Sequence, residues 1–206
     1  MTRPATQGPA DTQSLEESPA SPLIINRRRL LGLGLAAGAA GLLPNLAMPG
    51  SAYAALPKSG NRTLGFYNTH TDEQLKATYW SNGRYDKGAL KDINFILRDH
   101  RNNEVMPIDT KLLDLLTDLH RRSGSTKAIQ IVCGYRSPQT NAMLVKTSRG
   151  VAKNSLHMQG KAIDIRLADV SVRDLRDTAL GMKQGGVGYY PRSAFVHVDT
   201  GKVRHW

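Results

Sequence analysis

The stretch "SLHMQGKAIDI", residues 155–165, places a carboxylate inside a segment that otherwise has the apolar character of a β-strand. Ile163 and Ile165 flank Asp164, and His157 precedes the acid by seven residues. Successive side chains of a strand point to opposite faces, so Asp164 is expected to face away from the two isoleucines. A buried carboxylate is normally paired or bound to metal, because its desolvation is unfavourable. The stretch therefore predicts a strand that presents Asp164 to a polar site.

The segments around this stretch predict an α+β fold. Apolar residues at helical spacing predict helices within residues 86–100 and 109–124, the second ending at Gly124. Two further helices are expected after the capping residues Ser137 and Ser171. Strands are expected within residues 127–134, 161–167, 185–190 and 195–201, the last two as a hairpin. The expected architecture is a small antiparallel sheet with flanking helices over residues 86–206, while residues 55–85 show no clear pattern and are expected to form an N-terminal arm or loop.

The first 54 residues have the order of an export signal. A basic cluster, "RRRLL" at 27–31, precedes an apolar run and the small residues Ala52-Tyr53-Ala54, which fit a cleavage site. The paired arginines fit the twin-arginine variant of such signals. A retained membrane anchor is the alternative, but the run is short and broken by Pro44, whereas a spanning helix needs about 20 apolar residues. We expect a bacterial protein that contacts the membrane only during export and works in the periplasmic or cell-wall space.

The composition is strongly basic, with 28 Lys and Arg against 17 Asp and Glu and a formal net charge of +11. Such a charge favours polyanionic partners or serves solubility alone. Because an exported protein meets little nucleic acid, anionic cell-wall polymer and lipid headgroups are the expected targets. Cys133 is the single cysteine, so an intramolecular disulfide is excluded. Its position within a strand is typical of a small buried hydrophobic residue.

A second polar pair occurs in "FVHVDTG", residues 195–201. The strand period of two places His197 and Asp199 on one face. Two imidazoles and a carboxylate from separate segments match the ligand pattern of catalytic zinc, which keeps one position open for water. His157, Asp164 and His197 are the expected ligands. The alternative is that each is structural, with Asp164 paired to a neighbouring basic side chain.

Three motifs resemble one known family. Residues 155–164 are similar to the S-x-H-x-x-G-x-A-x-D motif of the zinc D-Ala-D-Ala metallopeptidases, and "GYRSPQTN" at 134–141 is similar to that family's G-Y-R-S segment. "FVHVDTG" fits the strand of the third ligand. The resemblance covers roughly residues 90–206 and is closest to exported murein endopeptidases. It implies a hedgehog- or D-Ala-D-Ala-peptidase-like fold, zinc held by His157, Asp164 and His197, and a substrate-polarising role for Arg136.

The chemistry of amide hydrolysis gives Arg136 an independent reason to be present. Attack on an amide carbonyl develops negative charge on its oxygen, and a guanidinium at the end of a strand can stabilise that charge or hold a peptide carboxylate. A surface arginine at a strand–helix turn is the alternative.

One position departs from the family pattern. Relatives often carry Glu, Asp or His two or three residues before the last zinc histidine, whereas this sequence has Ala194 and Phe195, which cannot transfer a proton. Asp199 is the nearest substitute, either as a catalytic base or as a partner that fixes the tautomer of His197. The base is therefore unassigned. In "GGVGYY", Tyr189 and Tyr190 point in opposite directions, so one of them could contact substrate.

These features together predict an exported zinc metallopeptidase that hydrolyses peptide cross-links of peptidoglycan. The family resemblance implies the 3-3 type of cross-link in preference to the 4-3 type. The loop between the second and third ligands is short, which favours a groove open at both ends over a closed exopeptidase pocket. Two alternatives are a D-Ala-D-Ala carboxypeptidase and a non-catalytic wall-binding module with a structural zinc.

Overall fold

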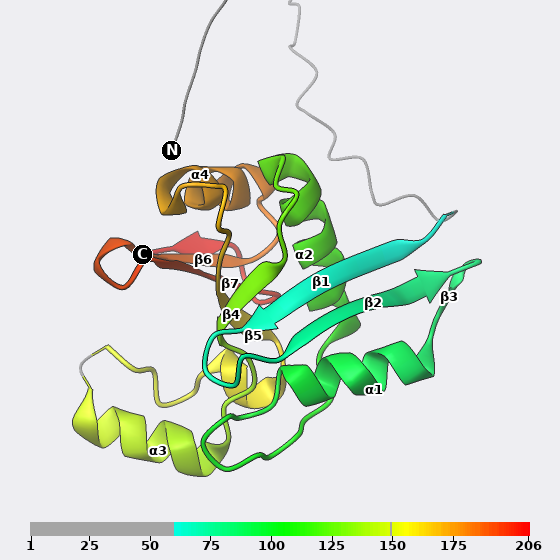
Figure 1. Ribbon diagram of the computed structural model, residues 1–206. Helices are drawn as coiled ribbons and strands as arrows, with labels where there is room; N and C mark the ends of the chain where they lie inside the picture. The colour runs from blue at the N-terminus through cyan, green and yellow to red at the C-terminus, as the bar shows by residue number, and fades with distance from the viewer. Residues whose placement is uncertain (1–59, 149) are drawn as a thin grey trace, which may run out of the picture. The chain divides into compact units, whose positions relative to one another are not determined.

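The described part of the chain folds around one mixed sheet flanked by helices (Figure 1). The computed structural model describes residues 60–148 and 150–206; the expected export signal, residues 1–54, lies outside them. The strands are β1 (Arg62–Asn68), β2 (Gln74–Ser81), β3 (Arg84–Tyr85), β4 (Ile129–Cys133), β5 (Ala162–Arg166), β6 (Gly186–Tyr190), β7 (Phe195–Asp199) and β8 (Arg204–His205). The helices are α1 (Lys87–Ile96), α2 (Thr110–Ser123), α3 (Pro138–Thr147) and α4 (Val172–Met182), with short 3-10 helices η1 (Leu156–Gln159) and η2 (Pro191–Ser193).

The sheet is larger than the sequence predicted. Its eight described strands lie in the order β3-β2-β1-β4-β5-β7-β6-β8. Most neighbours are antiparallel, but β1 pairs with β4, and β6 with β8, in parallel. The α+β class is confirmed, whereas the expectation of a small sheet is wrong.

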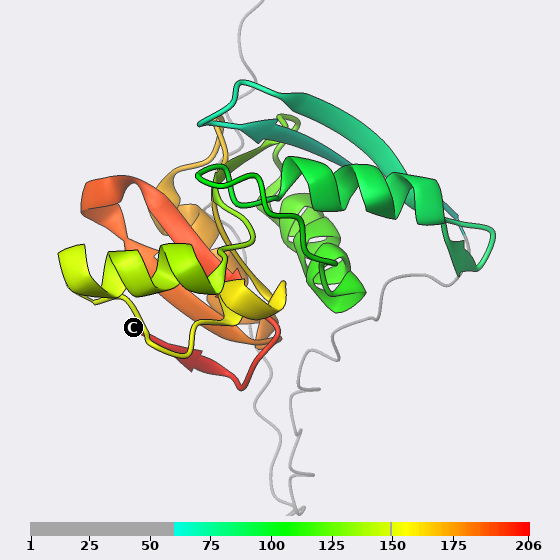
Figure 2. The same cartoon turned by 90° about the horizontal axis from the view of Figure 1, so that it is seen from below.

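The additional strands come from the stretch expected to be an arm or loop. Within residues 62–85, β1 and β2 form an antiparallel hairpin and β3 extends it. Leu64 and Phe66 in β1 and Ala77 and Tyr79 in β2 are buried. With two buried hydrophobic side chains in each strand, the alternation is too short to stand out from the sequence. Figure 2 shows α1 packed along this hairpin, where it contacts β2.

Three helix ends lie where capping residues predicted them: α3 and α4 begin after Ser137 and Ser171, and α2 ends at Gly124. Ser137 Oγ accepts a hydrogen bond from the backbone N–H of Thr140, and Ser171 Oγ accepts one from Asp174. Gly124 ends α2 in the left-handed conformation, with φ of 69°. Such a cap satisfies backbone groups that a helix end leaves unpaired.

The strands β5 and β7 separate the hydrophobic core from a polar face. Ile163, Ile165, Val196 and Val198 are at most 1% exposed and belong to the core; α4 contacts β6 and β7, and α2 contacts α4. In the register of these strands Asp164 lies opposite His197. The strand period therefore turns both side chains to the other face of the sheet.

Among the described residues, none of the helices combines the length and the apolar composition that a membrane crossing requires.

Candidate metal centre

The turn before β5 sets the position of His157. Ser155 caps η1 by accepting a hydrogen bond from the backbone N–H of His157, at 3.3 Å. Gly160 ends η1 with φ of 63°, a conformation that glycine adopts without steric cost. The chain then enters β5, so that His157 and Asp164 approach the same place from opposite ends of the turn.

The segment after β4 orients the imidazole of His157. A Cβ at Gly134 would lie 2.5 Å from the carbonyl oxygen of Leu97, so a larger residue does not fit there. The backbone N–H of Tyr135 donates to the same carbonyl, at 2.7 Å. This close approach fixes the carbonyl of Gly134, which lies 2.8 Å from His157 Nδ1. The G-Y-R motif thus connects the strand end to the first histidine and places Arg136 beside it.

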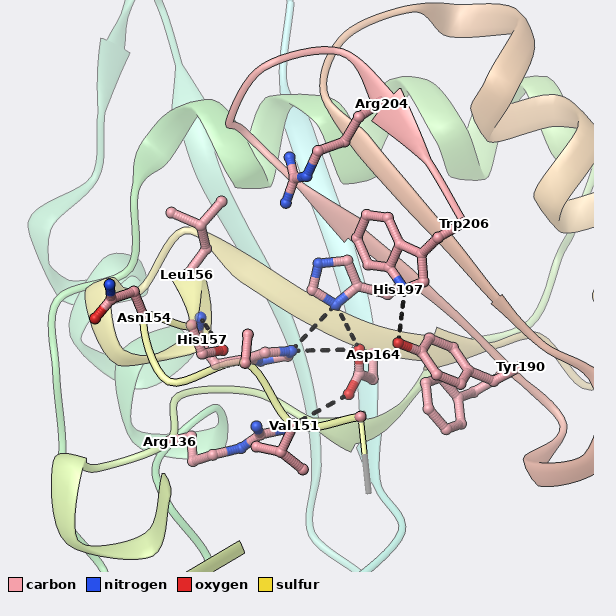
Figure 3. A pocket seen from close by; sticks show the side chains of 14 residues that line it. Arg136, Val151, Asn154, Leu156, His157, Asp164, Tyr190, His197, Arg204 and Trp206 are labelled. Carbon is pink, nitrogen blue, oxygen red and sulfur yellow. Dashed lines mark hydrogen bonds and ion pairs between the residues drawn. The ribbon is translucent and has the colours of Figure 1, made fainter. Parts of the chain in front are cut away.

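The structure brings the three expected ligands together (Figure 3). Asp164 Oδ1 lies 2.8 Å from His197 Nδ1 and 3.3 Å from His157 Nε2. The two imidazole nitrogens lie 3.2 Å apart. All three side chains are buried, with at most 10% of their surface exposed.

The outward nitrogens of both imidazoles face acceptors. His157 Nδ1 meets the Gly134 carbonyl, and His197 Nε2 lies 3.0 Å from Asp199 Oδ2. In the neutral form of each ring, which is the form that binds a metal, these nitrogens carry the proton and the inward nitrogens offer lone pairs. Two lone pairs and a carboxylate oxygen then face a common point, and such a group needs a positive charge between its members. This is the arrangement by which outer partners orient metal-binding histidines.

The distances also fit a zinc ion. Tetrahedral zinc with bonds of about 2.0–2.1 Å holds its ligand atoms about 3.3–3.4 Å apart. The separations of 3.2 and 3.3 Å agree with that value, and the 2.8 Å between Asp164 and His197 is shorter. The donor types, two imidazoles and a carboxylate, are those of catalytic zinc sites.

The ionisation of the site reflects the same demand for positive charge. Burial alone would lower the pKa of His157, but the Asp164 carboxylate and the Cys133 thiol outweigh it and raise this pKa well above its ordinary value. Burial alone would raise the pKa of Asp164, yet His157 and His197 bring it below its ordinary value. The carboxylate is thus held ionised beside groups that accept a cation.

Cys133 adjoins the centre, which the sequence did not indicate. Its Sγ belongs to a group with ligand atoms of His157 and Asp164 that all lie within 4.8 Å of one another. A register shift between Ile131 and Cys133 places two residues of β4 opposite one residue of β5, so Cys133 lies opposite Asp164. Such a bulge changes which side chains share a face, and a strand period read from the sequence cannot show it.

Asp199 lies behind His197 and is fully buried. Besides His197 Nε2, its carboxylate accepts hydrogen bonds from the backbone N–H groups of Gly186 and Gly201, at 3.1 and 2.8 Å. Both terminal nitrogens of Arg204 donate to it, at 2.7 and 3.1 Å. Burial would raise the pKa of Asp199, but hydrogen bonds from His197 and Arg204 lower it. This geometry favours the orienting role over that of a base.

Arg136 lies at the wall of the site. Its Nη2 is 4.0 Å from Asp164 Oδ2 and 3.4 Å from Cys133 Sγ, and its Nη1 donates to Asn141 at 3.3 Å. Its Nε is buried and has no hydrogen-bond partner within residues 60–148 and 150–206. The guanidinium is therefore fixed beside the centre and retains donor capacity.

A cavity of about 410 Å³ opens onto these groups. It is lined by the three expected ligands and Arg136, and also by Tyr190, Phe195, Arg204 and Trp206. Among the described lining residues, Asp164 alone has a side-chain carboxylate. Ala194 and Phe195 stand where relatives often carry an acid or a histidine, and they supply neither. The sequence suggested that Tyr189 or Tyr190 could contact substrate, and the structure places Tyr190 in the lining. The sequence gave no signal for Arg204 or Trp206. Arg204 reaches the cavity from β8, and Trp206 is the residue that follows this strand.

Comparison with known proteins identifies the family. The family described as peptidoglycan L,D-endopeptidase MepK matches residues 57–206. The peptidoglycan L,D-endopeptidase MepK of Escherichia coli strain K12 is 43% identical over 181 residues, which cover 88% of this chain and 97% of that protein. The probable peptidoglycan L,D-endopeptidase MepK of Haemophilus influenzae is 41% identical over 182 residues, covering 88% and 95% of the two chains. The chain therefore belongs to the MepK family of peptidoglycan peptidases.

Proposed function

We propose that this chain is a zinc-dependent endopeptidase that hydrolyses peptide cross-links of peptidoglycan outside the cytoplasmic membrane. One observation carries the metal assignment: two imidazole lone pairs and a carboxylate oxygen face one another within 3.3 Å at the wall of a cavity. The related endopeptidases support the reaction. The twin-arginine signal, expected from the sequence, supports the location.

His157, Asp164 and His197 would hold the ion in this proposal. Zinc, when bound, lowers the pKa of water to about 7 and so supplies a nucleophile at neutral pH. Asp199 keeps the proton of His197 on Nε2, which leaves Nδ1 free to bind. Arg136 donates hydrogen bonds to the substrate carbonyl oxygen, where negative charge develops.

The related enzymes are named L,D-endopeptidases, and this supports the 3-3 cross-link as substrate. In that cross-link an amide joins the L-centre carboxyl of one diaminopimelate to the D-centre amine of the next.

The described residues also support a groove rather than a closed pocket. In the segment between Asp164 and His197, the described residues that line the cavity are Tyr190 and Phe195, while helix α4 packs against β6 and β7. This segment therefore leaves the groove open.

The family resemblance also supports a hedgehog- or D-Ala-D-Ala-peptidase-like fold. We place the start of the peptidase domain before residue 86, because β1 pairs with β4 and so continues the sheet that carries the site.

A second candidate, a wall-binding module with a structural zinc, is supported by Cys133. A thiolate as a fourth protein ligand would close the position that water needs, as in structural zinc sites. The observation that favours the enzyme over this candidate is the Arg136 guanidinium, which lies 3.4 Å from the sulfur and lines the cavity.

Digestion of purified peptidoglycan sacculi by the purified protein tests the proposed function. We expect cross-linked muropeptide dimers to disappear, and a metal chelator to abolish this loss until zinc is restored. Release of D-alanine with intact dimers would indicate the carboxypeptidase. Zinc-dependent binding to sacculi without any product would indicate the binding module.

A further inference from the structure

The proposed site lacks an evident group to protonate the leaving nitrogen. When water cleaves an amide, the C–N bond breaks as the nitrogen gains a proton, because an amide anion is a very poor leaving group. Ala194 and Phe195 have no proton to give. Asp199 is enclosed by hydrogen-bond donors, and Arg136 remains protonated throughout. The donor must therefore come from another part of the cavity wall.

The register of the β6–β7 hairpin selects the residues of β6 that face the site. Gly188 lies opposite His197 and Tyr190 lies opposite Phe195. Directly opposed residues of an antiparallel pair share a face, so Gly186, Gly188 and Tyr190 face the same side as His197. Two of these three positions have no side chain. Tyr190 is thus the side chain that β6 contributes to this face.

The two glycines make room for side chains from the end of the described chain. A Cβ at Gly188 would lie 2.7 Å from the indole ring of Trp206, and one at Gly186 would lie 2.5 Å from Arg204 Nη1. The backbone holds Trp206 in this place, because its N–H donates to Val187 and its carbonyl accepts from Tyr189. The indole is therefore seated on β6 beside Tyr190.

The indole fixes the hydroxyl of Tyr190. Trp206 Nε1 donates to Tyr190 Oη at 2.8 Å (Figure 3). An indole nitrogen can only donate, so the phenol oxygen accepts this bond and keeps its own proton for another partner. No acceptor for that proton is found among the described residues. The Tyr190 ring also stacks on Phe195, with centroids 4.5 Å apart, which limits its motion.

Tyr190 and Arg136 lie on opposite sides of the proposed centre. Arg136 follows β4, Tyr190 ends β6, and the sheet order places β5 and β7 between these two strands. Both residues line the same cavity. A substrate that directs its carbonyl oxygen to Arg136 would direct the other side of the scissile bond toward Tyr190.

We propose that Tyr190 is the catalytic proton donor to the leaving nitrogen, an inference that rests on the proposed endopeptidase function. As the C–N bond breaks, the Tyr190 hydroxyl gives its proton to the nitrogen, and the bonding electron pair stays on that nitrogen. The phenolate then takes up a proton that the attacking water has lost. The attacking water supplies two protons in all. One restores the tyrosine hydroxyl, and the other passes from the new carboxyl group to the amine, so that the products are a carboxylate and a protonated amine. Trp206 is a positioning residue, since it acts through Tyr190.

The test compares Tyr190→Phe with the parent protein on two substrates that differ in leaving group. One is a 3-3 cross-linked dimer, and the other is the same dimer with an ester in place of the scissile amide. Tyr190→Phe keeps the ring and removes the hydroxyl. We expect kcat for the amide to fall by about 10²-fold, within the range for loss of a general acid. KM should change little, and the ester, whose leaving group needs less protonation, should lose at most a few-fold in rate.

Tyr189→Phe is the matched control, because Tyr189 points to the other face, under the guanidinium of Arg176 at 4.5 Å. It should cleave both substrates at the parental rate. Trp206→Phe should lower the amide rate by less than Tyr190→Phe does. Zinc content and binding of the amide dimer to metal-free protein should be unchanged in all three variants.

Two results would count against the inference, and a third would count against the proposed function on which it rests. If Tyr190→Phe cleaves the amide as fast as the parent, Tyr190 is not catalytic. If it slows amide and ester equally, its hydroxyl stabilises charge on the carbonyl oxygen and does not protonate the nitrogen. If the parent protein cleaves neither substrate, the proposed function itself fails, which separates that failure from an error about Tyr190.

Discussion

Replacing His157, Asp164 or His197 with alanine, one at a time, should remove both bound zinc and the cleavage of sacculi. Catalytic zinc is held by three protein ligands, so a variant with two of them should not retain the ion. The two remaining ligands would also be buried polar groups without a partner, which is unfavourable. Zinc content is measured by elemental analysis of the purified protein, and cleavage by the loss of muropeptide dimers. We expect activity below detection in all three variants.

Two controls make this result specific. His120→Ala removes a histidine of α2 whose Nε2 contacts the carbonyl of Lys127, away from the site, and should keep full zinc and activity. Cys133→Ser should also keep zinc if the thiol is only a neighbour, whereas loss of zinc would make it a fourth ligand and favour the structural site. Full metal occupancy in any one alanine variant would show that the replaced residue is not a ligand.

Arg136→Ala should retain zinc and lose about 10²-fold or more in kcat, comparable to the loss of one oxyanion donor. The lost donor stabilises negative charge that develops on the carbonyl oxygen. Arg136→Lys should recover part of the rate, because an ammonium supplies charge without the planar arrangement of donors. Steady-state rates on a cross-linked dimer, with zinc content measured in parallel, provide the comparison. Parental cleavage by zinc-loaded Arg136→Ala would refute this role.

The positions of the expected ligands on their strands could be predicted because a strand alternates. Ile163 and Ile165 enter the core, so Asp164 must face the other side, and Val196 and Val198 do the same for His197. Ser137, Ser171 and Gly124 likewise located three of the helix ends. These are local properties, and they depend on residues that are close in sequence.

Properties that depend on pairing between distant segments could not be predicted in this way. The bulge that turns Cys133 toward Asp164 arises from the register of β4 against β5. Arg204 and Trp206 reach the site because β8 adds to β6 in parallel, and two glycines of β6 leave space for their side chains. The strands β1 and β2 carry too few buried side chains to be recognised, although they extend the sheet beyond β4.

The most direct test of the account is the choice of bond by the zinc-loaded protein. Purified 3-3 and 4-3 cross-linked muropeptide dimers and uncross-linked pentapeptide monomers are incubated separately with the protein, with and without chelator, and the products are separated. We expect the 3-3 dimer to be converted to monomers, the 4-3 dimer to be cleaved more slowly or not at all, and the pentapeptide to remain intact, with all cleavage abolished by the chelator. Release of D-alanine from the pentapeptide while both dimers stay intact would contradict the endopeptidase assignment.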